Sequence, residues 1–373
     1  MMSNVQRPVH QLVHTLSYGD AISTEVLALQ RALHARNIPS EIFSIHCHPK
    51  LVGRARHFTE LQSCDSAEII LHYSLGSPLN AVFKSWSRGR RALVYHNITP
   101  SAWYRSINSR VAADIDAGVA ELPELCGISD AIWADSEFNA KEIEALGYRA
   151  EVLDLLVDPG RWTAPRNEAL YQCVVNTPGT QVLHVGRIAP NKCLEDVIKS
   201  FYFLRKYRDP QARLRLVGID TDTELYSFSL RELVAYLGIG ESVEFVGGLA
   251  DDEVRAMYEA SDVYLCMSEH EGFCLPLIEA MNFKLPIVAF SAGAVPATMG
   301  GAGIVLTQKR FAEIGELLWR VSNDAQLREP LVAEGARRVT AFSYERFSAR
   351  VLDLLKELSP DRCEARRVEA CAV

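Results

Sequence analysis

The stretch DVYLCMSEHEGFCLPLIEAM, residues 262–281, decides the fold class that we expect. It opens with a short apolar run, turns at Gly272, and continues as a helical pattern in which Pro276 suits the first turn. A buried strand that leads directly into a helix is the repeating unit of a parallel sheet covered by crossover helices. The free N–H groups at the start of such a helix attract an anion, most naturally a phosphate.

The same alternation of short apolar runs and longer helical patterns extends over the rest of the chain. Helices are expected over residues 20–35, 137–146 and 194–205. The first of them has an apolar stripe of Ile22, Val26, Leu29 and Leu33. Strands are expected over residues 9–16, 40–45, 68–74, 91–98, 131–136, 181–186, 213–218, 243–247, 262–267, 286–290 and 303–306. The pattern predicts an α/β protein with two doubly wound, Rossmann-like sheets.

The length of 373 residues favours two domains. Between about residues 158 and 180 the periodicity fails and the composition turns to Pro, Gly, Asn and Arg, as in an interdomain connection. We therefore expect one domain over residues 1–165 and a second over residues 170–342. Because such sheets bind ligands at the carboxyl ends of their strands, we expect the active site in a cleft between two domains that face each other.

The composition, with 48% hydrophobic and 23% charged residues, is typical of a globular protein that dissolves in water. The 39 Lys and Arg against 47 Asp and Glu give a net charge of −8, which offers no overall attraction for nucleic acid. No run approaches the ~18 apolar residues of a membrane-spanning helix, and the amino-terminal residues lack the apolar core of a secretion signal. We expect a cytoplasmic protein.

Nine cysteines are scattered along the chain without a C-x-x-C pair, which indicates reduced thiols. The only metal-like cluster is His46-Cys47-His48. It lacks a second ligand pair at zinc-finger spacing, so we interpret it as an ordinary strand end. No metal site is expected.

Two clusters of polar residues follow predicted strands in the second half of the chain. Glu271 lies in the turn of the opening stretch and Glu279 about one turn into its helix, so these carboxylates can reach different parts of one ligand. In GRIAPNK, residues 186–192, Arg187 and Lys192 place two cations after a predicted strand, where an anionic ligand belongs. A solvated helix face and an ordinary basic turn are the alternative interpretations.

Together with HNITP at residues 96–100, the strings GRIAPNK and EHEGFCLPLIEAM resemble the motifs of retaining glycosyltransferases of family 4, also described as glycosyl transferases group 1. The order of the strings and the Glu-x7-Glu spacing also fit. The resemblance covers nearly the whole chain. It implies the GT-B architecture, in which the first domain binds the acceptor, the second binds a nucleotide-sugar donor, and a helix at about residues 343–360 packs back on the first domain.

The resemblance also implies roles for particular residues. Arg187 and Lys192 would bind the donor diphosphate, and Glu279 the nucleotide ribose. Glu271 would hold hydroxyls of the transferred sugar, with His96 nearby. The catalytic set implied is therefore His96, Arg187, Lys192 and Glu271. Further donor contacts are expected at Gly19, Asp20, Gly186, Gly272, Phe273, Cys274 and Leu275.

The first domain carries candidates for the acceptor side. Asp20 follows Gly19 at a site where the family often has a Gly-Gly pair, so its carboxylate can bind acceptor or sugar, with a helix N-cap as the alternative. His72 ends a predicted strand and is expected on the acceptor side together with Asn97. For His72, hydrogen bonding within the fold is the alternative.

Two departures from the family pattern leave the sugar preference open. Cys274 stands where Gly is common and should crowd the loop at the sugar phosphate, and Ala297 stands where a glutamate is common, which removes a hydrogen bond. The co-substrate implied is a nucleoside-diphosphate sugar of unknown base. No cofactor or metal is expected, because two cations and a helix amino end can stabilise the leaving diphosphate.

We therefore expect a retaining hexosyltransferase that transfers a hexose or related sugar to a hydroxyl acceptor in polysaccharide or glycoconjugate assembly. The acceptor can be a glycan, a lipid-linked molecule or a small molecule. Glycosylation of a natural product, a non-catalytic nucleotide-sugar binding protein, a sugar-nucleotide epimerase and a glycan phosphorylase are the alternatives. A dehydrogenase is disfavoured because no G-x-G-x-x-G follows either opening strand.

The stretch FKSWSRGRR, residues 83–91, mixes basic and aromatic residues. Such a stretch can dock a protein on anionic lipid, which would give a weak peripheral contact at the inner face of the membrane. A solvated helix end that leads into a strand is the interpretation that we favour, because Gly89 and the short length limit any amphipathic face.

Overall fold

The computed structural model describes residues 7–63, 66–158 and 160–358, and these divide into two compact units. Unit 1 comprises the described residues within Met1–Ile98, Ala113–Leu156 and Ser343–Val373. Unit 2 comprises Thr99–Ala112 and the described residues within Val157–Phe342. Compared with the expected domain limits, unit 2 gains residues 99–112 and begins at Val157. A hydrogen bond from Asn108 Nδ2 to the carbonyl oxygen of Asp222 is one contact that ties the first of these segments to unit 2.

Unit 1 contains a seven-stranded sheet in the order β3-β2-β1-β4-β5-β6-β7, with every pair parallel. Its strands are β1 (Val9–Leu16), β2 (Ile42–Cys47), β3 (Arg56–His57), β4 (Glu68–Tyr73), β5 (Arg91–Tyr95), β6 (Ala131–Ala134) and β7 (Glu151–Val152). Its helices are α1 (Ala21–His34), α2 (Pro78–Ser85), α3 (Ser109–Ile128), α4 (Glu137–Ala145) and α13 (Tyr344–Leu355). The first turn of α3 is counted with unit 2.

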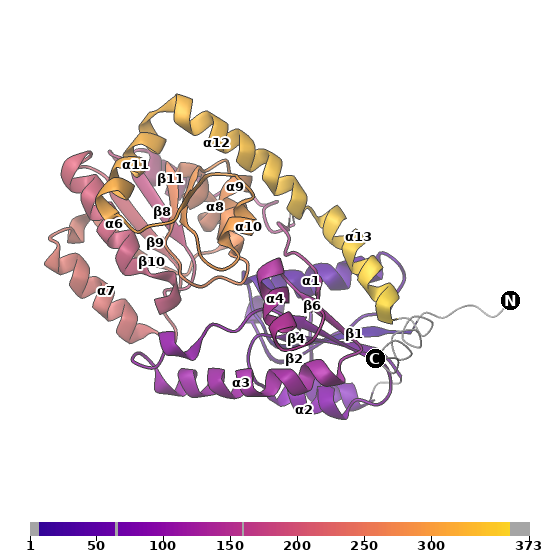
Figure 1. The fold of residues 1–373 in the computed structure, drawn as a ribbon. Helices are drawn as coiled ribbons and strands as arrows, with labels where there is room; N and C mark the ends of the chain where they lie inside the picture. The colour runs from indigo at the N-terminus through magenta and orange to yellow at the C-terminus, as the bar shows by residue number, and fades with distance from the viewer. Residues whose placement is uncertain (1–6, 64–65, 159, 359–373) are drawn as a thin grey trace. The chain divides into compact units, whose positions relative to one another are not determined.

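Helix α13 comes from the far end of the chain and packs in unit 1, beside α1 (Figure 1). Its buried side chains Phe347, Val351 and Leu354 belong to one apolar cluster with Leu29 and Leu33 of α1. Each such side chain contributes about 1.5–3 kcal/mol when fully buried. The predicted return of a carboxy-terminal helix to the first domain is therefore confirmed.

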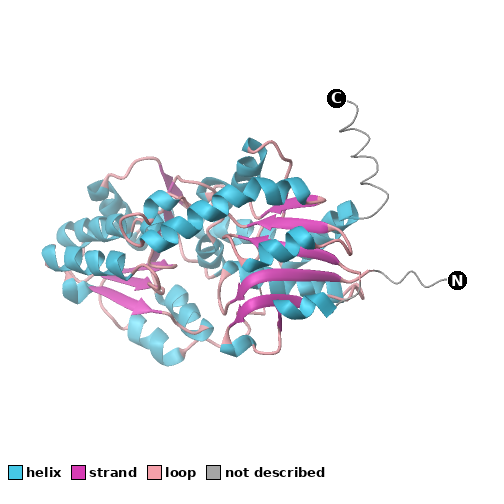
Figure 2. Cartoon of the chain, turned by 90° about the horizontal axis from the view of Figure 1, so that it is seen from below, coloured by secondary structure: helices cyan, strands magenta, loops and turns pink. Residues whose placement is uncertain are grey.

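Unit 2 contains a six-stranded parallel sheet in the order β10-β9-β8-β11-β12-β13. Helices lie on both faces of the sheets (Figure 2). The strands are β8 (Gln181–Val185), β9 (Arg213–Val217), β10 (Val243–Gly247), β11 (Val263–Cys266), β12 (Ile287–Phe290) and β13 (Ile304–Leu306). The helices are α5 (Glu168–Val175), α6 (Leu194–Tyr207), α7 (Glu224–Tyr236), α8 (Asp251–Ala260), α9 (Leu275–Asn282), α10 (Val295–Met299), α11 (Phe311–Asn323) and α12 (Ala325–Arg338).

Each of the eleven predicted strands is present within a few residues of its expected limits, and the two parallel sheets confirm the predicted α/β fold class. The sequence did not indicate β3 and β7, because each has only two residues at a sheet edge. The expectation of an irregular connection from about residue 158 to 180 was wrong over Glu168–Val175, which forms α5. This helix buries only Val174, so it leaves almost no apolar periodicity in the sequence.

The basic and aromatic stretch at residues 83–91 faces inward more than its composition indicated. Phe83 is fully buried, and Trp86 is buried with its indole N–H donating to the carbonyl oxygen of Ala67 at 3.0 Å. Lys84 pairs with Glu121 and Glu124 at 2.7 and 2.6 Å.

Among residues 7–63, 66–158 and 160–358, no helix combines the length and the apolar character needed to span a bilayer.

Candidate functional site

The strand order of unit 2 reverses between β8 and β11, and this reversal positions the site. Ligands of doubly wound sheets bind beyond the carboxyl ends of the strands at such a switch point. Strand β8 ends at Val185 and leads into the Gly186–Lys192 loop, and β11 ends at Cys266 and leads into the Ser268–Cys274 loop. The two clusters that the sequence singled out are therefore neighbours in unit 2.

Lys192 and Glu271 form an ion pair, although 79 residues separate them in sequence. The Lys192 ammonium donates to both carboxylate oxygens of Glu271, each at 2.7 Å, and the Glu271 side chain is only 7% exposed. Burial alone would lower the pKa of Lys192, but the Glu271 charge raises it well above its ordinary value. Burial likewise raises the pKa of Glu271, and the Lys192 charge outweighs this and lowers it. Both groups are therefore ionised at neutral pH.

Backbone contacts hold the Glu271 loop in place. Asn191 Nδ2 donates to the carbonyl oxygen of His270 at 3.0 Å, and the N–H of Glu269 donates to the carbonyl oxygen of Asn191 at 2.9 Å. Gly293 lets its own backbone lie directly against the Glu271 loop, because a Cβ at residue 293 would lie 2.3 Å from the carbonyl oxygen of Glu271. Any side chain at residue 293 would therefore displace the Glu271 loop.

The N-cap residues of helices α6 and α9 are cysteines in the left-handed conformation, beside the Lys192–Glu271 pair. Cys193 has φ 48° and Cys274 has φ 71°, and neither side chain caps its helix. Helix α9 has Pro276 in its first turn, as predicted. Phe273, Cys274 and Leu275 are buried, so any contact they make with a ligand comes from the backbone of this turn. The left-handed φ at Cys274 explains why a glycine suits this position.

Arg187 differs from Lys192 in that its side chain is 40% exposed. Its guanidinium donates to the carbonyl oxygen of Thr221 at 2.5 Å and lies 3.8 Å from the Asp222 carboxylate. The preceding Gly186 lies against Gly218, where a Cβ would approach the Gly186 carbonyl oxygen to 1.9 Å. Arg187 is thus the more exposed of the two expected phosphate contacts, and its partners are surface groups.

Glu279 is buried on α9, with a hydrogen-bond donor on each carboxylate oxygen. Arg161 Nη1 donates to Oε1 at 2.5 Å, and the Tyr258 hydroxyl donates to Oε2 at 2.9 Å. Arg161 also donates to Asp251 at 2.7 Å. The sequence analysis missed both donors. Arg161 lies in the segment that was interpreted as a connection, and Tyr258 follows the helical pattern of α8 like any core aromatic residue.

In unit 1, His96 lies at the end of β5 inside a network of buried polar side chains. Its Nε2 lies 2.9 Å from His72 Nδ1, and its Nδ1 faces Glu25 at 3.4 Å and Asp135 at 3.5 Å. His72 Nε2 lies 3.0 Å from Gln11 Oε1. Both histidines therefore direct their ring nitrogens at groups of the same unit, and the hydrogen bonding considered for His72 as the alternative is present.

Burial and neighbouring charges together set the protonation states in this network. Burial raises the pKa of Glu25 to about 8, and neither of its carboxylate oxygens has a hydrogen-bond partner among the described residues. Burial and the His96 charge hold the pKa of His72 well below its usual range. His72 is therefore neutral and donates from Nε2 to Gln11, so its Nδ1 accepts a hydrogen bond from the Nε2–H of His96. Burial opposes the protonation of His96, but Glu25 and Asp135 raise its pKa.

The remaining unit 1 candidates lie in the loops after β1 and β5. Asp20 is the N-cap of α1 and accepts the N–H of Ser23 at 2.6 Å, as the structural alternative predicted. Gly19 precedes it with φ 82°. Asn97 has φ 71° and donates to Asn139 and Glu142 at 2.9 and 2.8 Å. Each polar side chain named here has a role within the fold, so a ligand contact would be additional to it.

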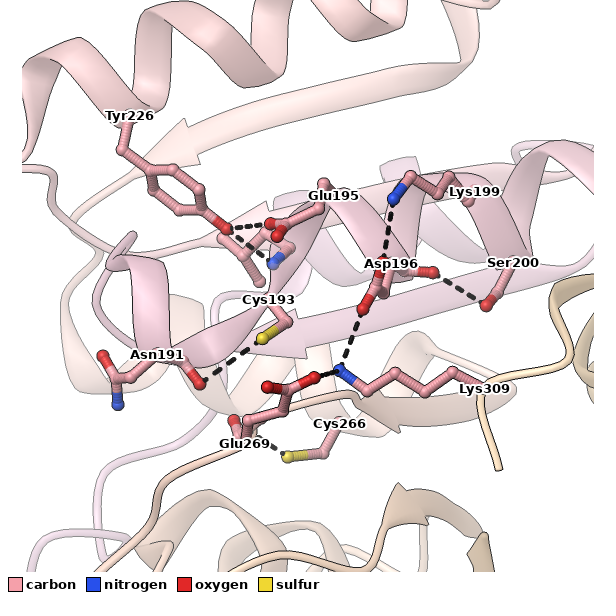
Figure 3. Close-up of polar contacts among 12 residues, drawn as sticks. Asn191, Cys193, Glu195, Asp196, Lys199, Ser200, Tyr226, Cys266, Glu269 and Lys309 are labelled. Carbon is pink, nitrogen blue, oxygen red and sulfur yellow. Dashed lines mark hydrogen bonds and ion pairs between the residues drawn. The ribbon is translucent and has the colours of Figure 1, made fainter. Parts of the chain in front are cut away.

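Three groups of side chains in the described part of the chain have ligand atoms close enough to hold a metal ion: Glu25–His72–His96, Cys266–Glu271–Cys274 and Cys193–Asp196–Glu269. Lysines already neutralise the acids of the last two groups. Figure 3 shows Lys309 between Asp196 and Glu269, at 2.8 and 2.7 Å. A metal ion in either of the last two groups would be repelled by the lysine beside it, so we assign no metal to those two groups. At His46-Cys47-His48, the predicted strand end is confirmed, because β2 ends at Cys47.

Comparison with known proteins agrees with the motifs. Residues 172–338 match the model of the family described as glycosyl transferases group 1. Among curated proteins, D-inositol 3-phosphate glycosyltransferase from Actinosynnema mirum is 27% identical over 242 residues, which cover 60% of this chain and 56% of that protein. The chain spans about half the length of the curated relatives it matches.

Solved structures with the same fold cover nearly the whole chain. Sucrose-phosphate synthase from Thermosynechococcus elongatus matches with a TM-score of 0.76 and 17% identity over 95% of this chain and 99% of that one. HepE from Anabaena, solved with UDP-glucose, matches with a TM-score of 0.69 and 18% identity over 94% of this chain and all of that one. The predicted GT-B architecture is confirmed as a fold, and the resemblance stated on the motifs is confirmed over residues 172–338.

Proposed function

From the match of residues 172–338 to the glycosyl transferases group 1 model, we propose that the chain is a retaining glycosyltransferase. It transfers a hexose or related sugar from a nucleoside diphosphate to a hydroxyl acceptor, in polysaccharide or glycoconjugate assembly. Unit 2 binds the donor and unit 1 the acceptor, which is a glycan, a lipid-linked molecule or a small molecule. The observation that carries the proposal is the ion pair of Lys192 and Glu271 at the switch point of the unit 2 sheet.

The chemistry of the donor fits this pair. Breaking the anomeric C–O bond leaves a nucleoside diphosphate with additional negative charge, which cations and helix amino ends stabilise. Lys192, Arg187 and the first turn of α9 supply those groups. Glu271 stays ionised because Lys192 is beside it, and an ionised carboxylate accepts hydrogen bonds from sugar hydroxyls.

In the proposed reaction, the acceptor oxygen attacks the anomeric carbon on the face that the diphosphate leaves. The departing phosphate oxygen takes the proton of the acceptor hydroxyl, so the products are the glycoside and the protonated nucleoside diphosphate. The positive charge needed at the leaving group comes from side chains, so the reaction should persist when divalent metals are chelated. Backbone contacts from Gly186 and from Gly272–Leu275 complete the donor site, and Glu279 holds the ribose.

The test begins with a thermal-shift screen of UDP, GDP, ADP, TDP and their sugar conjugates, because a ligand of the folded state raises its melting temperature. The nucleotide sugar that binds is then incubated with and without candidate acceptors, with and without EDTA. Sugar transfer supports the proposal. Binding without transfer or hydrolysis favours the second candidate, a non-catalytic nucleotide-sugar binding protein. A change of the donor sugar without any acceptor would identify an epimerase instead.

A further inference from the structure

The segment of unit 2 that precedes α5 places an arginine on the carboxylate of Glu279. Arg161 is only 14% exposed and is bound at two points, through Nη1 to Glu279 and through Nε to Asp251. Its guanidinium also lies 4.4 Å from the centroid of the Trp162 ring, which packs edge-on against Phe283. The arginine therefore has one geometry, with its position on Glu279 fixed by acid and aromatic contacts.

Tyr258 fixes the other oxygen of the same carboxylate. The Tyr258 side chain is buried, and its ring stacks on Phe283 at a centroid distance of 5.4 Å. Burial and the Glu279 charge raise its pKa well above the ordinary value, so the hydroxyl keeps its proton and donates. Arg161 and Tyr258 together prevent the Glu279 carboxylate from rotating about its terminal bond.

A carboxylate held in this way has a defined capacity for further hydrogen bonds. Each carboxylate oxygen offers about two lone-pair sites, and each oxygen of Glu279 already accepts one donor from the protein. Counted over the part of the chain that the structure describes, one acceptor site remains on each oxygen of this carboxylate. Two neighbouring hydroxyls, as in the 2′,3′-diol of ribose, match this pair of acceptors, whereas a 2′-deoxyribose leaves one of them unused.

We propose that Arg161 and Tyr258 are positioning residues that hold the Glu279 carboxylate so that it accepts hydrogen bonds from both the 2′- and the 3′-hydroxyl of ribose. The donor site therefore binds ribonucleoside diphosphates more tightly than 2′-deoxyribonucleoside diphosphates. This inference rests on the proposed function of unit 2 as a donor site, and narrows its substrate class. It places deoxythymidine diphosphate sugars outside the substrate range.

The test is isothermal titration calorimetry with the full chain and matched pairs of ligands: UDP and dUDP, GDP and dGDP, ADP and dADP. A hydrogen bond to a charged group changes affinity by about tenfold or more, so the wild type should prefer the ribonucleotide of the binding pair by at least that factor. In Arg161→Ala and Tyr258→Phe this preference should fall to about threefold or less, through weaker binding of the ribonucleotide alone. Arg166→Ala is the matched control, because Arg166 lies in the same segment and pairs with Glu168 and Glu259 instead of Glu279.

Each result separates the inference from the function on which it rests. Equal weakening of both nucleotides in Tyr258→Phe and Arg161→Ala would reduce these residues to a structural role and overturn the inference. An unchanged preference in these variants, with a lost preference in Glu279→Gln, would also overturn it and leave the ribose assignment intact. If the wild type binds ribonucleotide and deoxyribonucleotide equally, the inferred selection for the 2′,3′-diol is overturned, but the proposed diphosphate site is not. Absence of any nucleoside diphosphate binding would overturn the proposed function itself.

Discussion

Replacing Lys192 with alanine should reduce stability and turnover for two different reasons. The Glu271 carboxylate, 7% exposed, would lose the ammonium that lies 2.7 Å from both of its oxygens. Breaking a buried ion pair costs about 3–5 kcal/mol, and the lower value applies here because the Lys192 side chain is 21% exposed. For a unit of this size, a loss of about 3 kcal/mol lowers Tm by about 6–12 °C.

The turnover loss comes from the leaving group. One lost cation at a developing diphosphate costs about 2–4 kcal/mol of transition-state stabilisation, which lowers kcat by about 30- to 1,000-fold. Differential scanning calorimetry and steady-state kinetics with the donor found in the nucleotide screen measure the two effects separately.

A second variant shows that the two effects are distinct. In Lys192→Ala/Glu271→Gln no unpaired charge remains, so most of the lost stability should return while kcat stays low. Lys309→Ala is the matched control, because Lys309 also bridges two acids in unit 2 but lies outside the proposed donor contacts. It should lower Tm and leave kcat within a factor of about two. Near-normal kcat in Lys192→Ala, or recovery of kcat in the double variant, would refute the assignment of Lys192 to the diphosphate.

Three further predictions follow from exposure and burial. Arg187→Ala should remove about 2–4 kcal/mol of transition-state stabilisation, which lowers kcat by about 30- to 1,000-fold. It should change the free energy of unfolding by under about 0.5 kcal/mol, because Arg187 is partly exposed and bound only to surface groups; a large drop in Tm would contradict this. Glu25→Gln should become more stable relative to wild type as the pH rises from 5 to 8.5. Burial raises the folded-state pKa of Glu25 to about 8, so ionisation of Glu25 destabilises the folded wild type. This destabilisation is absent below the ordinary pKa of a glutamate and grows to about 5 kcal/mol above pH 8. A Tm difference between variant and wild type that is constant with pH would refute this. The stretch at residues 83–91 should give no salt-sensitive binding in flotation with anionic liposomes, since Phe83 and Trp86 are buried, and clear flotation at low salt would show that this expectation is wrong.

The periodicity of the sequence was sufficient for the strands, because each core strand is a short apolar run bounded by turn residues. It also predicted that Lys192 and Glu271 serve one site, because parallel strands bring the loops at their carboxyl ends together. It could not show that these two side chains pair with each other. That contact depends on side-chain direction across two loops, which depends in turn on the space left by Gly293.

Of the residues that the sequence analysis missed, Glu25 left a signal in the sequence and Arg161 did not. Glu25 lies three residues after Ile22 and four before Leu29, so it falls on the apolar stripe of α1. An acid in such a stripe indicates a buried charge that needs a partner. Arg161 left no comparable signal, because it follows Pro and Gly in an aperiodic segment and its partners lie about 90 and 118 residues away.

Glu25 and Glu271 are buried to nearly the same degree, yet at neutral pH Glu25 is mainly protonated and neutral whereas Glu271 is ionised. Burial raises the pKa of both carboxyls, so it cannot explain the difference. The explanation is the partner. Glu271 has an ammonium donating to both oxygens. Glu25 instead shares the Nδ1 of His96 with a second acid, Asp135, whose charge raises the pKa of Glu25 further. In the proposed function, Lys192 therefore has two tasks: it binds the donor diphosphate, and its charge keeps Glu271 ionised so that this carboxylate can accept hydrogen bonds from sugar hydroxyls. This dual demand on one ammonium is why substitution of Lys192 should be more damaging than substitution of Arg187.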